Sequence, residues 1–175
     1  MTTMIKQPIA GVTAGKKNLI HFVYPSIAAI APGRLMGSLC NSIPLKINGI
    51  KLSVLLFGLP LGGLASLLYF AGKAIGEKYV ITSQSVEKWK MLLGVQSRLL
   101  GEIELGLIDK IELEELPGQE FFHAADVVLF DVAGKEILRF EGVQRADVFA
   151  QNITEARDAN VQTKLALEAI AARHA

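Results

Sequence analysis

The segment KLSVLLFGLPLGGLASLLYFAGK, residues Lys51–Lys73, decides what the rest of the chain is built around. Between its two lysines lie 21 residues without a charge, and Ser53 and Ser66 are the only small polar residues among them. As a helix, these residues would rise about 31 Å, which matches the hydrocarbon core of a bilayer. We therefore predict a transmembrane helix over about 51–73. The alternative, a buried core helix of a soluble domain, remains open.

Glycine and proline interrupt the centre of this apolar segment. Such residues would break a helix in water, but they are tolerated in lipid, where the backbone has no other hydrogen-bond partner. We expect them to kink the helix near its middle and to let another helix approach closely. An earlier pair of glycines, four residues apart, predicts a second contact surface. The helix-contact candidates are Gly33, Gly37, Gly58, Pro60, Gly62 and Gly63.

The region before this segment is divided by one charge. Residues 18–33 and 35–45 are uncharged, and Arg34 separates them. Placing Arg34 at a bilayer centre would cost about 2.5–3.5 kcal/mol. A helix over about 26–43 would instead be amphipathic and would lie in the membrane interface. The alternative is a first membrane span over about 19–41 that pairs with the second.

Bases and aromatic residues mark the expected membrane boundaries. Lysines flank both ends of the apolar segment, a tyrosine lies near one end, and an arginine lies on the polar side of the preceding helix. Tyrosine and snorkelling bases are favoured at the level of the lipid headgroups. The predicted interface residues are Arg34, Lys51, Tyr69 and Lys73.

The charge is distributed unevenly along the 175 residues. The first 72 residues hold six bases and no acid, whereas the remainder holds 12 bases and 17 acids, a net charge of −5. This asymmetry predicts two different environments. We expect a basic tail over 1–18 and a membrane region over 19–75. A β domain with a capping helix should follow over 76–158, with a helical extension over 159–175.

After Lys73, the hydrophobic pattern changes to period two. Alternating apolar and acidic residues, as in 103–105 and 111–114, predict strands with one buried face. From about Ala146 the spacing is helical, with a possible break at 158–160. We predict a mainly β fold with α-helices, in which an antiparallel barrel or sandwich is capped by a C-terminal helix. The expected strands are 77–82, 86–92, 97–105, 108–116, 125–132 and 135–143.

The order of the strand motifs resembles that of the bacterial pleckstrin-homology-like (PH-like) domain of small membrane proteins. The resemblance covers about 75–158 and begins with Tyr79-Val80-Ile81-Thr82 directly after the anchor. Alanine stands at 124 and 125, where the family usually has a glycine. The resemblance implies a PH-like barrel or sandwich, without catalytic residues, on the cytoplasmic face of a bacterial inner membrane. The other matching positions are Ile103, Leu105, Ile108, Ile111, 125–129, Gly134, Ile137, Phe140, Val143, Phe149, Ile153 and Ala156.

Side chains that commonly act in catalysis or bind metals are few and scattered in the sequence. Cys40 is the one cysteine, and His21, His123 and His174 lie far apart in the sequence. No Ser–His–Asp set or carboxylate pair stands out. We therefore predict no catalytic, cofactor-binding or metal-binding residue.

The acidic strands suggest a partner surface. We predict that Glu102, Glu104, Glu112 and Glu114 form one sheet face that attracts a basic partner. The predicted function is a non-catalytic, membrane-anchored accessory, scaffolding or assembly subunit of a larger membrane protein complex. The family resemblance implies that this complex is a photosynthetic or other bioenergetic one. Its expected partners are membrane lipids and integral membrane subunits, not nucleic acid. The alternative is a peripheral lipid- or ligand-binding regulator without a stable partner.

Overall fold

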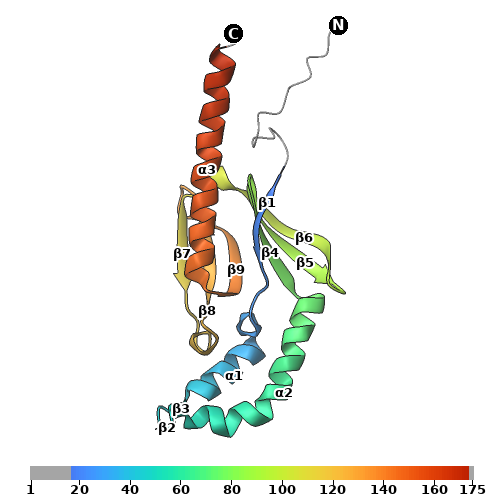
Figure 1. Cartoon of the computed structure of the whole chain (residues 1–175), viewed down its shortest axis with the longest axis vertical. Helices are drawn as coiled ribbons and strands as arrows, with labels where there is room; N and C mark the ends of the chain where they lie inside the picture. The colour runs from blue at the N-terminus through green and yellow to red at the C-terminus, as the bar shows by residue number, and fades with distance from the viewer. Residues whose placement is uncertain (1–16, 174–175) are drawn as a thin grey trace.

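The computed structural model describes residues 17–173, which form two antiparallel sheets and several helices (Figure 1). The four-stranded sheet has the order β1-β4-β5-β6, and the three-stranded sheet has the order β7-β8-β9. The fold is therefore mixed α/β. Apart from a two-stranded hairpin, the strands of the described residues form two separate sheets and not one closed barrel. The strands are β1 (Leu19–Val23), β4 (Glu77–Thr82), β5 (Ser85–Leu92), β6 (Val95–Glu104), β7 (Lys110–Glu114), β8 (Ala124–Phe130) and β9 (Glu136–Gln144).

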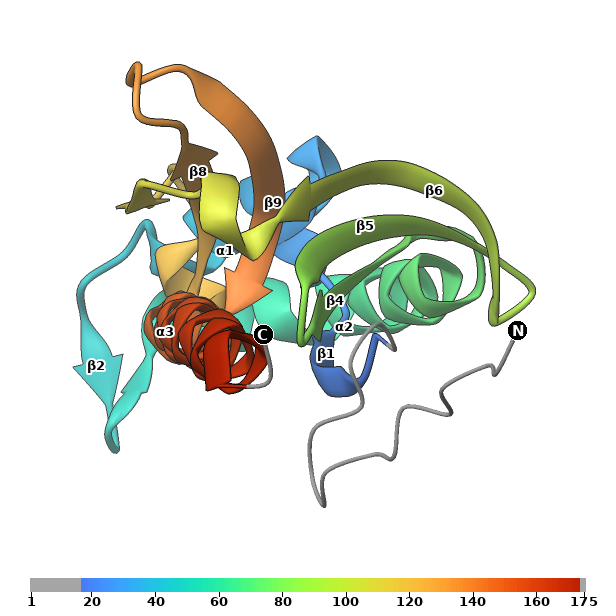
Figure 2. The ribbon, with the colours of Figure 1, turned by 90° about the horizontal axis from the view of Figure 1, so that it is seen from above.

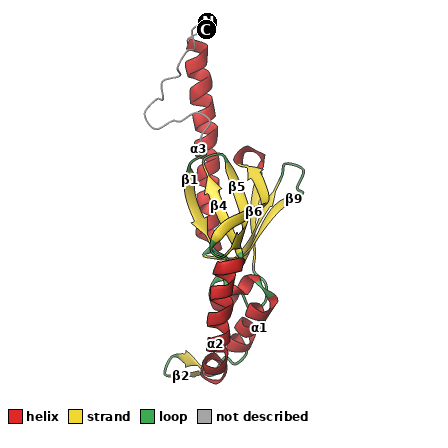
Figure 3. Cartoon of the chain, turned by 90° about the vertical axis from the view of Figure 1, so that its right-hand side faces the viewer, coloured by secondary structure: helices red, strands yellow, loops and turns green. Residues whose placement is uncertain are grey.

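The helices extend from both ends of the sheets. Figures 1 and 3 show α1 and α2 below the sheets, whereas α3 runs alongside the sheets and projects beyond them at the opposite end. A small hairpin, β2 (Lys46–Ile47) and β3 (Ile50–Lys51), joins α1 to α2. The helices are α1 (Ala31–Asn41), α2 (Leu52–Ile75) and α3 (Ala146–Arg173), with short 3-10 helices η1 (Ile27–Ala29), η2 (Leu105–Leu107) and η3 (Glu120–Phe122).

Both sheets and the first half of α3 share one hydrophobic core. We call this unit, made of β1, β4–β9 and residues 146–158, the β domain. The ring of Phe140 packs edge-on against Tyr79 at 4.8 Å and against Phe149 at 5.6 Å, so it joins β9 to β4 and to α3. The predicted capping helix is thus part of the core. Its fully buried members include Tyr79, Ile81, Val86, Leu105, Val127, Leu129, Phe140, Val143, Phe149 and Ile153.

The Tyr79 hydroxyl also ties the two sheets together. It donates a hydrogen bond to the Glu141 carbonyl oxygen at 3.1 Å and accepts one from the Glu141 backbone N–H, also at 3.1 Å. Burial raises the pKa of Tyr79 well above its ordinary value. The first residue of the Tyr-Val-Ile-Thr motif is therefore a neutral cross-link inside the core.

The N-terminal segment corrects the predicted membrane region. Residues 19–23 form β1, which pairs with β4 from Leu19 opposite Thr82 to Val23 opposite Tyr79. A first membrane span over 19–41 is therefore wrong, and the membrane region cannot begin at residue 19. The helix that does form, α1, has 11 residues and rises only about 16 Å. Pairing with β1 covers the backbone of β4 that would otherwise be a sheet edge.

The C-terminal helix also differs from its prediction. α3 continues without a break from Ala146 to Arg173, so the expected break at 158–160 is wrong. No glycine or proline occurs in this helix, and Asn160 is held in place by donating a hydrogen bond to the Ser83 carbonyl at 2.7 Å. The predicted boundary between 158 and 159 therefore lies inside one helix. Residues 1–16 of the predicted tail and 174–175 of the extension are outside the described residues.

Candidate functional site

The apolar surface of α2 is the most unusual feature of the molecule. Within residues 17–173, α2 is the one helix long and apolar enough to cross a membrane, and none of its most apolar stretch is buried. Leu59, for example, is 87% exposed. Soluble monomers rarely expose a contiguous apolar surface of this extent. Within residues 17–173, α2 is therefore not a buried core helix, which was the alternative prediction.

The helix bends in the way that its proline predicts. Figure 1 shows that the first turns of α2 run across the end of the molecule and that its later turns rise toward the sheets. Pro60 lies inside the helix. Because proline has no N–H, the carbonyl of Leu56 loses its usual hydrogen bond, and such a loss bends helices.

The glycines of α2 face open space. Apart from the adjacent residues and backbone of α2 itself, a Cβ atom added at Gly62 or Gly63 would meet no described atom within 4 Å. One at Gly58 would meet only a methyl group of Val54, at 3.3 Å. The described chain therefore does not place another helix against this surface.

The glycines of α1 are used differently. A side chain at Gly33 would collide with the Ile27 carbonyl of η1, and one at Gly37 would collide with the Gly118 carbonyl and the Phe122 ring. Both glycines therefore contact short segments of the same chain. They let α1 approach η1 and the loop over 115–123 of the β domain.

A buried polar network holds this loop against the sheet. Asp126, which is 2% exposed, accepts hydrogen bonds from the Gln119 side-chain amide at 2.6 Å and from the Gly142 N–H at 2.9 Å. The Gln119 carbonyl oxygen in turn accepts from the Leu116 N–H at 2.9 Å. Sequence analysis did not single out Asp126. The feature that could have identified it in the sequence is an acidic residue within an otherwise apolar strand.

The other face of α1 is joined to α2. Ser53, which is fully buried, donates a hydrogen bond to the Cys40 carbonyl at the end of α1 at 2.5 Å. The Lys51 ammonium donates to the Asn41 side-chain oxygen, and the Asn41 amide donates to the Glu120 carboxylate at 2.8 Å. The short helix α1 is therefore a strut between α2 and the β domain.

The four predicted interface residues lie at different places. Arg34 donates a hydrogen bond to the Ala29 carbonyl at 3.2 Å and so braces η1. Lys51 precedes the first turn of α2, whereas Tyr69 and Lys73 lie one turn apart near its last turns. The Lys73 ammonium is 4.6 Å from the centre of the Tyr69 ring. Lysines thus stand at opposite ends of the apolar surface of α2.

Two lysines and three aromatic rings gather where α2 meets the sheet. We call Phe22, Tyr24, Tyr69, Lys73 and Lys78 the cation–aromatic cluster. The Lys78 ammonium is 4.3 Å from the Phe22 ring centre, and the Lys73 ammonium is 5.8 Å from that of Tyr24. Neither lysine forms an ion pair with a carboxylate of the described chain. A cation over an aromatic face is stabilised by the ring quadrupole.

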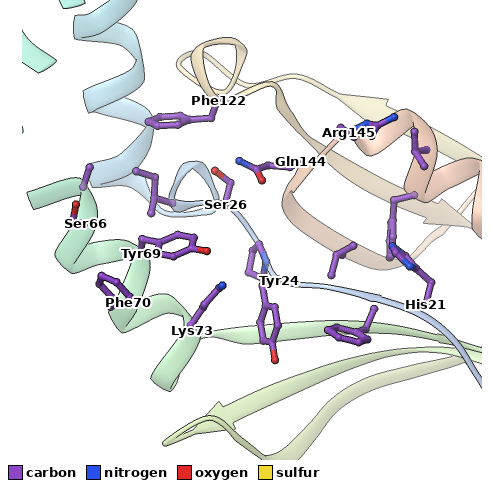
Figure 4. A pocket seen from close by; sticks show the side chains of 17 residues that line it. His21, Tyr24, Ser26, Ser66, Tyr69, Phe70, Lys73, Phe122, Gln144 and Arg145 are labelled. Atoms are coloured by element: carbon purple, nitrogen blue, oxygen red, sulfur yellow. The ribbon is translucent and has the colours of Figure 1, made fainter. Parts of the chain in front are cut away.

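An open groove of about 770 Å³ lies next to this cluster. Figure 4 shows Tyr69, Phe70 and Lys73 from α2 on one side, with Gln144 and Arg145 on the other. None of its 17 lining residues is acidic. Aromatic walls with basic groups at the rim fit an amphipathic anion. Sequence analysis missed this groove because its walls come from four segments that are distant in the sequence: 21–27, 65–73, Phe122 and 144–149. The aromatic residues that line it are Phe22, Tyr24, Tyr69, Phe70, Phe122 and Phe149.

The predicted acidic face is not formed as one surface. Glu102 and Glu104 lie on β6, whereas Glu112 and Glu114 lie on β7, which belongs to the other sheet. The prediction failed because the chain changes sheets at η2, between these two strands.

The chain's own bases accompany three of these four glutamates. The Lys17 ammonium contacts Glu102 and also lies 3.1 Å from Glu87. Its hydrogen bond lowers the pKa of Glu102. The remaining pairs are Lys110–Glu112 at 2.5 Å and Arg139–Glu114 at 2.7 Å. Much of the predicted attraction for a basic partner is therefore satisfied internally.

The described residues do not bring potential metal ligands together. Within 17–173, no group of three histidine, cysteine or acidic side chains could hold a metal ion. Cys40 is buried in α1. Comparisons with protein-family models, curated proteins and solved structures find no match to the chain. Its function must therefore be inferred from α2, the groove and the β domain themselves.

Proposed function

We propose that this chain is a non-catalytic, membrane-anchored module that serves as an accessory, scaffolding or assembly subunit of a larger membrane protein complex. α2 inserts its apolar surface into the bacterial inner membrane. The β domain lies at the cytoplasmic face, because β1 before α2 and β4 after it pair in one sheet and must stay on the same side of the bilayer. The observation that carries this proposal is the uncovered apolar surface of α2. The open glycines at 62 and 63 leave room on it for a helix of another subunit.

The proposal includes a PH-like architecture for the β domain. Its support is the combination of four and three antiparallel strands with a C-terminal helix packed into their common core. The N-terminal strand β1 completes the four-stranded sheet. The order of motifs from Tyr79 to Ala156 supports the same assignment.

A scaffold must hold its binding surfaces in a fixed arrangement, and α1 supports this role. It is joined to α2 through Ser53 and to the β domain through the close contact of Gly37 with Gly118. A membrane subunit bound to α2 and a second partner bound to the β domain would therefore be held in a defined orientation.

A second candidate function is a lipid- or ligand-binding regulator. The observation that favours it is the groove, which combines aromatic walls with Lys73 and Arg145 and has no acidic lining residue. An amphipathic anion would place its apolar part against the rings and its charge near these bases. This function needs no stable protein partner.

The deciding experiment is mild-detergent extraction of the tagged, full-length chain from its native membrane, followed by size analysis and mass spectrometry. A discrete complex of constant stoichiometry is expected. A lone particle, or one that contains only copies of this chain, would reject the scaffold and leave the lipid-binding function.

A matched pair of variants tests the helix surface. Changing Gly62 and Gly63 to leucine should dissolve the complex while the chain itself still folds, because no described atom outside the neighbouring part of α2 lies within 4 Å of either added Cβ. Leu64→Phe, on another side of the exposed helix, should leave the complex intact. Equal effects of both changes would show that this surface does not bind the partner.

A further inference from the structure

The turn between β5 and β6 exposes three large apolar residues. Leu92, Leu93 and Val95 are 58%, 83% and 67% exposed. Together with Gly94 they form the tip of the hairpin, in which Leu92 pairs with Val95. We call residues 92–95 the hairpin tip.

The backbone conformation of this turn does not account for a leucine at position 93. Leu93 and Gly94 have φ angles of +51° and +79°, as in the two-residue turns that favour Asn-Gly. Leucine is strained at positive φ. A strained, exposed leucine indicates a role for the side chain outside the folded chain itself.

The hairpin tip lies directly beside the end of α2. The Gly94 N–H donates a hydrogen bond to the Ala74 carbonyl at 3.1 Å, and the Met91 N–H donates to the Gly76 carbonyl at 2.9 Å. Figure 1 shows the hairpin reaching down to the top of α2. The exposed leucines therefore continue the apolar surface of α2.

Bases surround this junction on both sides. Lys73 of the cation–aromatic cluster immediately precedes Ala74, and Lys90 pairs with Arg98 across the hairpin behind its tip. Residues 88–101 contain no acid, although the part of the chain after residue 72 has a net charge of −5. An apolar tip followed by bases is complementary to an anionic lipid surface.

We propose that the hairpin tip is a second membrane-inserting element, which enters the same leaflet that the C-terminal end of α2 reaches. Leu92, Leu93 and Val95 lie among the upper parts of the acyl chains, while Lys90 and Arg98 contact phosphate groups of anionic lipids. The inference rests on the proposed anchoring by α2. Two attachment points would fix the orientation of the β domain relative to the bilayer.

The test uses single cysteines labelled with an environment-sensitive fluorophore in the full-length chain. In a Cys40→Ala background, the labelled positions are Leu93→Cys, Val132→Cys and Leu59→Cys. Val132 is a matched control because it is 85% exposed and lies in the β8–β9 turn, on another side of the molecule (Figure 2). The protein is reconstituted into phosphatidylcholine vesicles with and without phosphatidylglycerol, doped with lipids brominated at known depths.

We expect the probe at 93 to be blue-shifted and quenched several-fold more strongly than the probe at 132, mainly by shallow bromines. The probe at 59 should be quenched by deep bromines. If 59 is quenched and 93 behaves like 132, the hairpin proposal is overturned and the anchor stands. If neither is quenched, the anchor and the hairpin proposal both fail.

A charge variant tests the lipid contact separately. The double change of Lys90 and Arg98 to glutamine should abolish the increase in quenching at 93 that phosphatidylglycerol produces. Lys135→Gln, in the β8–β9 turn, should leave that increase unchanged. Persistence of the increase in the double variant would overturn the assigned headgroup contact.

Discussion

The helices α1 and α2 carry similar glycine spacings but use them in opposite ways. In α1, the space beside Gly33 and Gly37 is occupied by the chain itself, through carbonyl groups of η1 and of the loop at Gly118. In α2, no other segment of the described chain packs against Gly62 or Gly63. Glycines on a helix surface therefore indicate that another segment can pack closely against that helix. Only the fold shows whether this segment belongs to the same chain.

The largest effect is expected from a change that disrupts the loop over 115–123, on which α1 docks. Asp126→Ala would leave the Gln119 amide and the Gly142 N–H without their acceptor. At about 1–3 kcal/mol for each buried unsatisfied group, we expect the free energy of unfolding to fall by about 2–6 kcal/mol. Thermal unfolding of the full chain in mild detergent measures this. Hydrogen exchange should accelerate in α1 but not at the centre of α2, and equal acceleration in both helices would contradict the strut.

The glycines themselves provide the most direct comparison. Gly37→Leu should destabilise the chain by about 1–3 kcal/mol, because the new side chain must displace the Gly118 carbonyl or the Phe122 ring. Gly63→Leu is the matched control, with an expected change within about 0.5 kcal/mol. Chemical unfolding in the same detergent compares the two. A similar loss in both would show that α2 is covered by its own chain.

A substitution inside the core calibrates these effects because it touches neither helix. Tyr79→Phe should cost about 1–3 kcal/mol, since the Glu141 N–H and carbonyl lose the hydroxyl that serves both.

The same residue predicts a pH dependence. Because burial raises the pKa of Tyr79, its stabilising contribution is complete below about pH 10, the ordinary tyrosine pKa. That contribution is lost as the pH rises toward the higher folded-state value. Unfolding curves across this range should show the loss in the parent chain and a smaller one in Tyr79→Phe. If the parent chain and Tyr79→Phe lost the same stability at alkaline pH, the predicted contribution of the Tyr79 hydroxyl would be contradicted.

The smallest expected effect concerns the start of the described chain. Lys17→Ala removes the contact that lowers the pKa of Glu102. Both side chains are partly exposed, so the loss should stay below about 0.5 kcal/mol at neutral pH. It should vanish as the pH falls through the lowered pKa of Glu102, where the parent chain loses the same contribution. Salt titration of the melting temperature measures it, and an unchanged salt dependence would show that the contact is not formed.

Local sequence patterns predicted the bounds of helices and strands better than they predicted which elements pack against one another. The expected helix over 51–73 corresponds to α2 at 52–75, and the strand at 77–82 is β4. By contrast, Leu19–Val23 was assigned to the membrane region because an uncharged apolar segment suits either environment. Its strand partner, β4, lies about 60 residues later in the sequence, where no local pattern could indicate it.

The sequence by itself determined the apolar character of α2, its proline bend, the alternation of the strands and the uneven charge, because each depends on residues close together in the chain. The tertiary structure alone decided that the glutamates lie on two sheets, that α1 docks on the loop at Gly118, and that distant segments enclose the groove. It also placed the hairpin tip beside Ala74. These arrangements depend on contacts between segments far apart in the sequence, which form only when the sheets and helices pack around a common core.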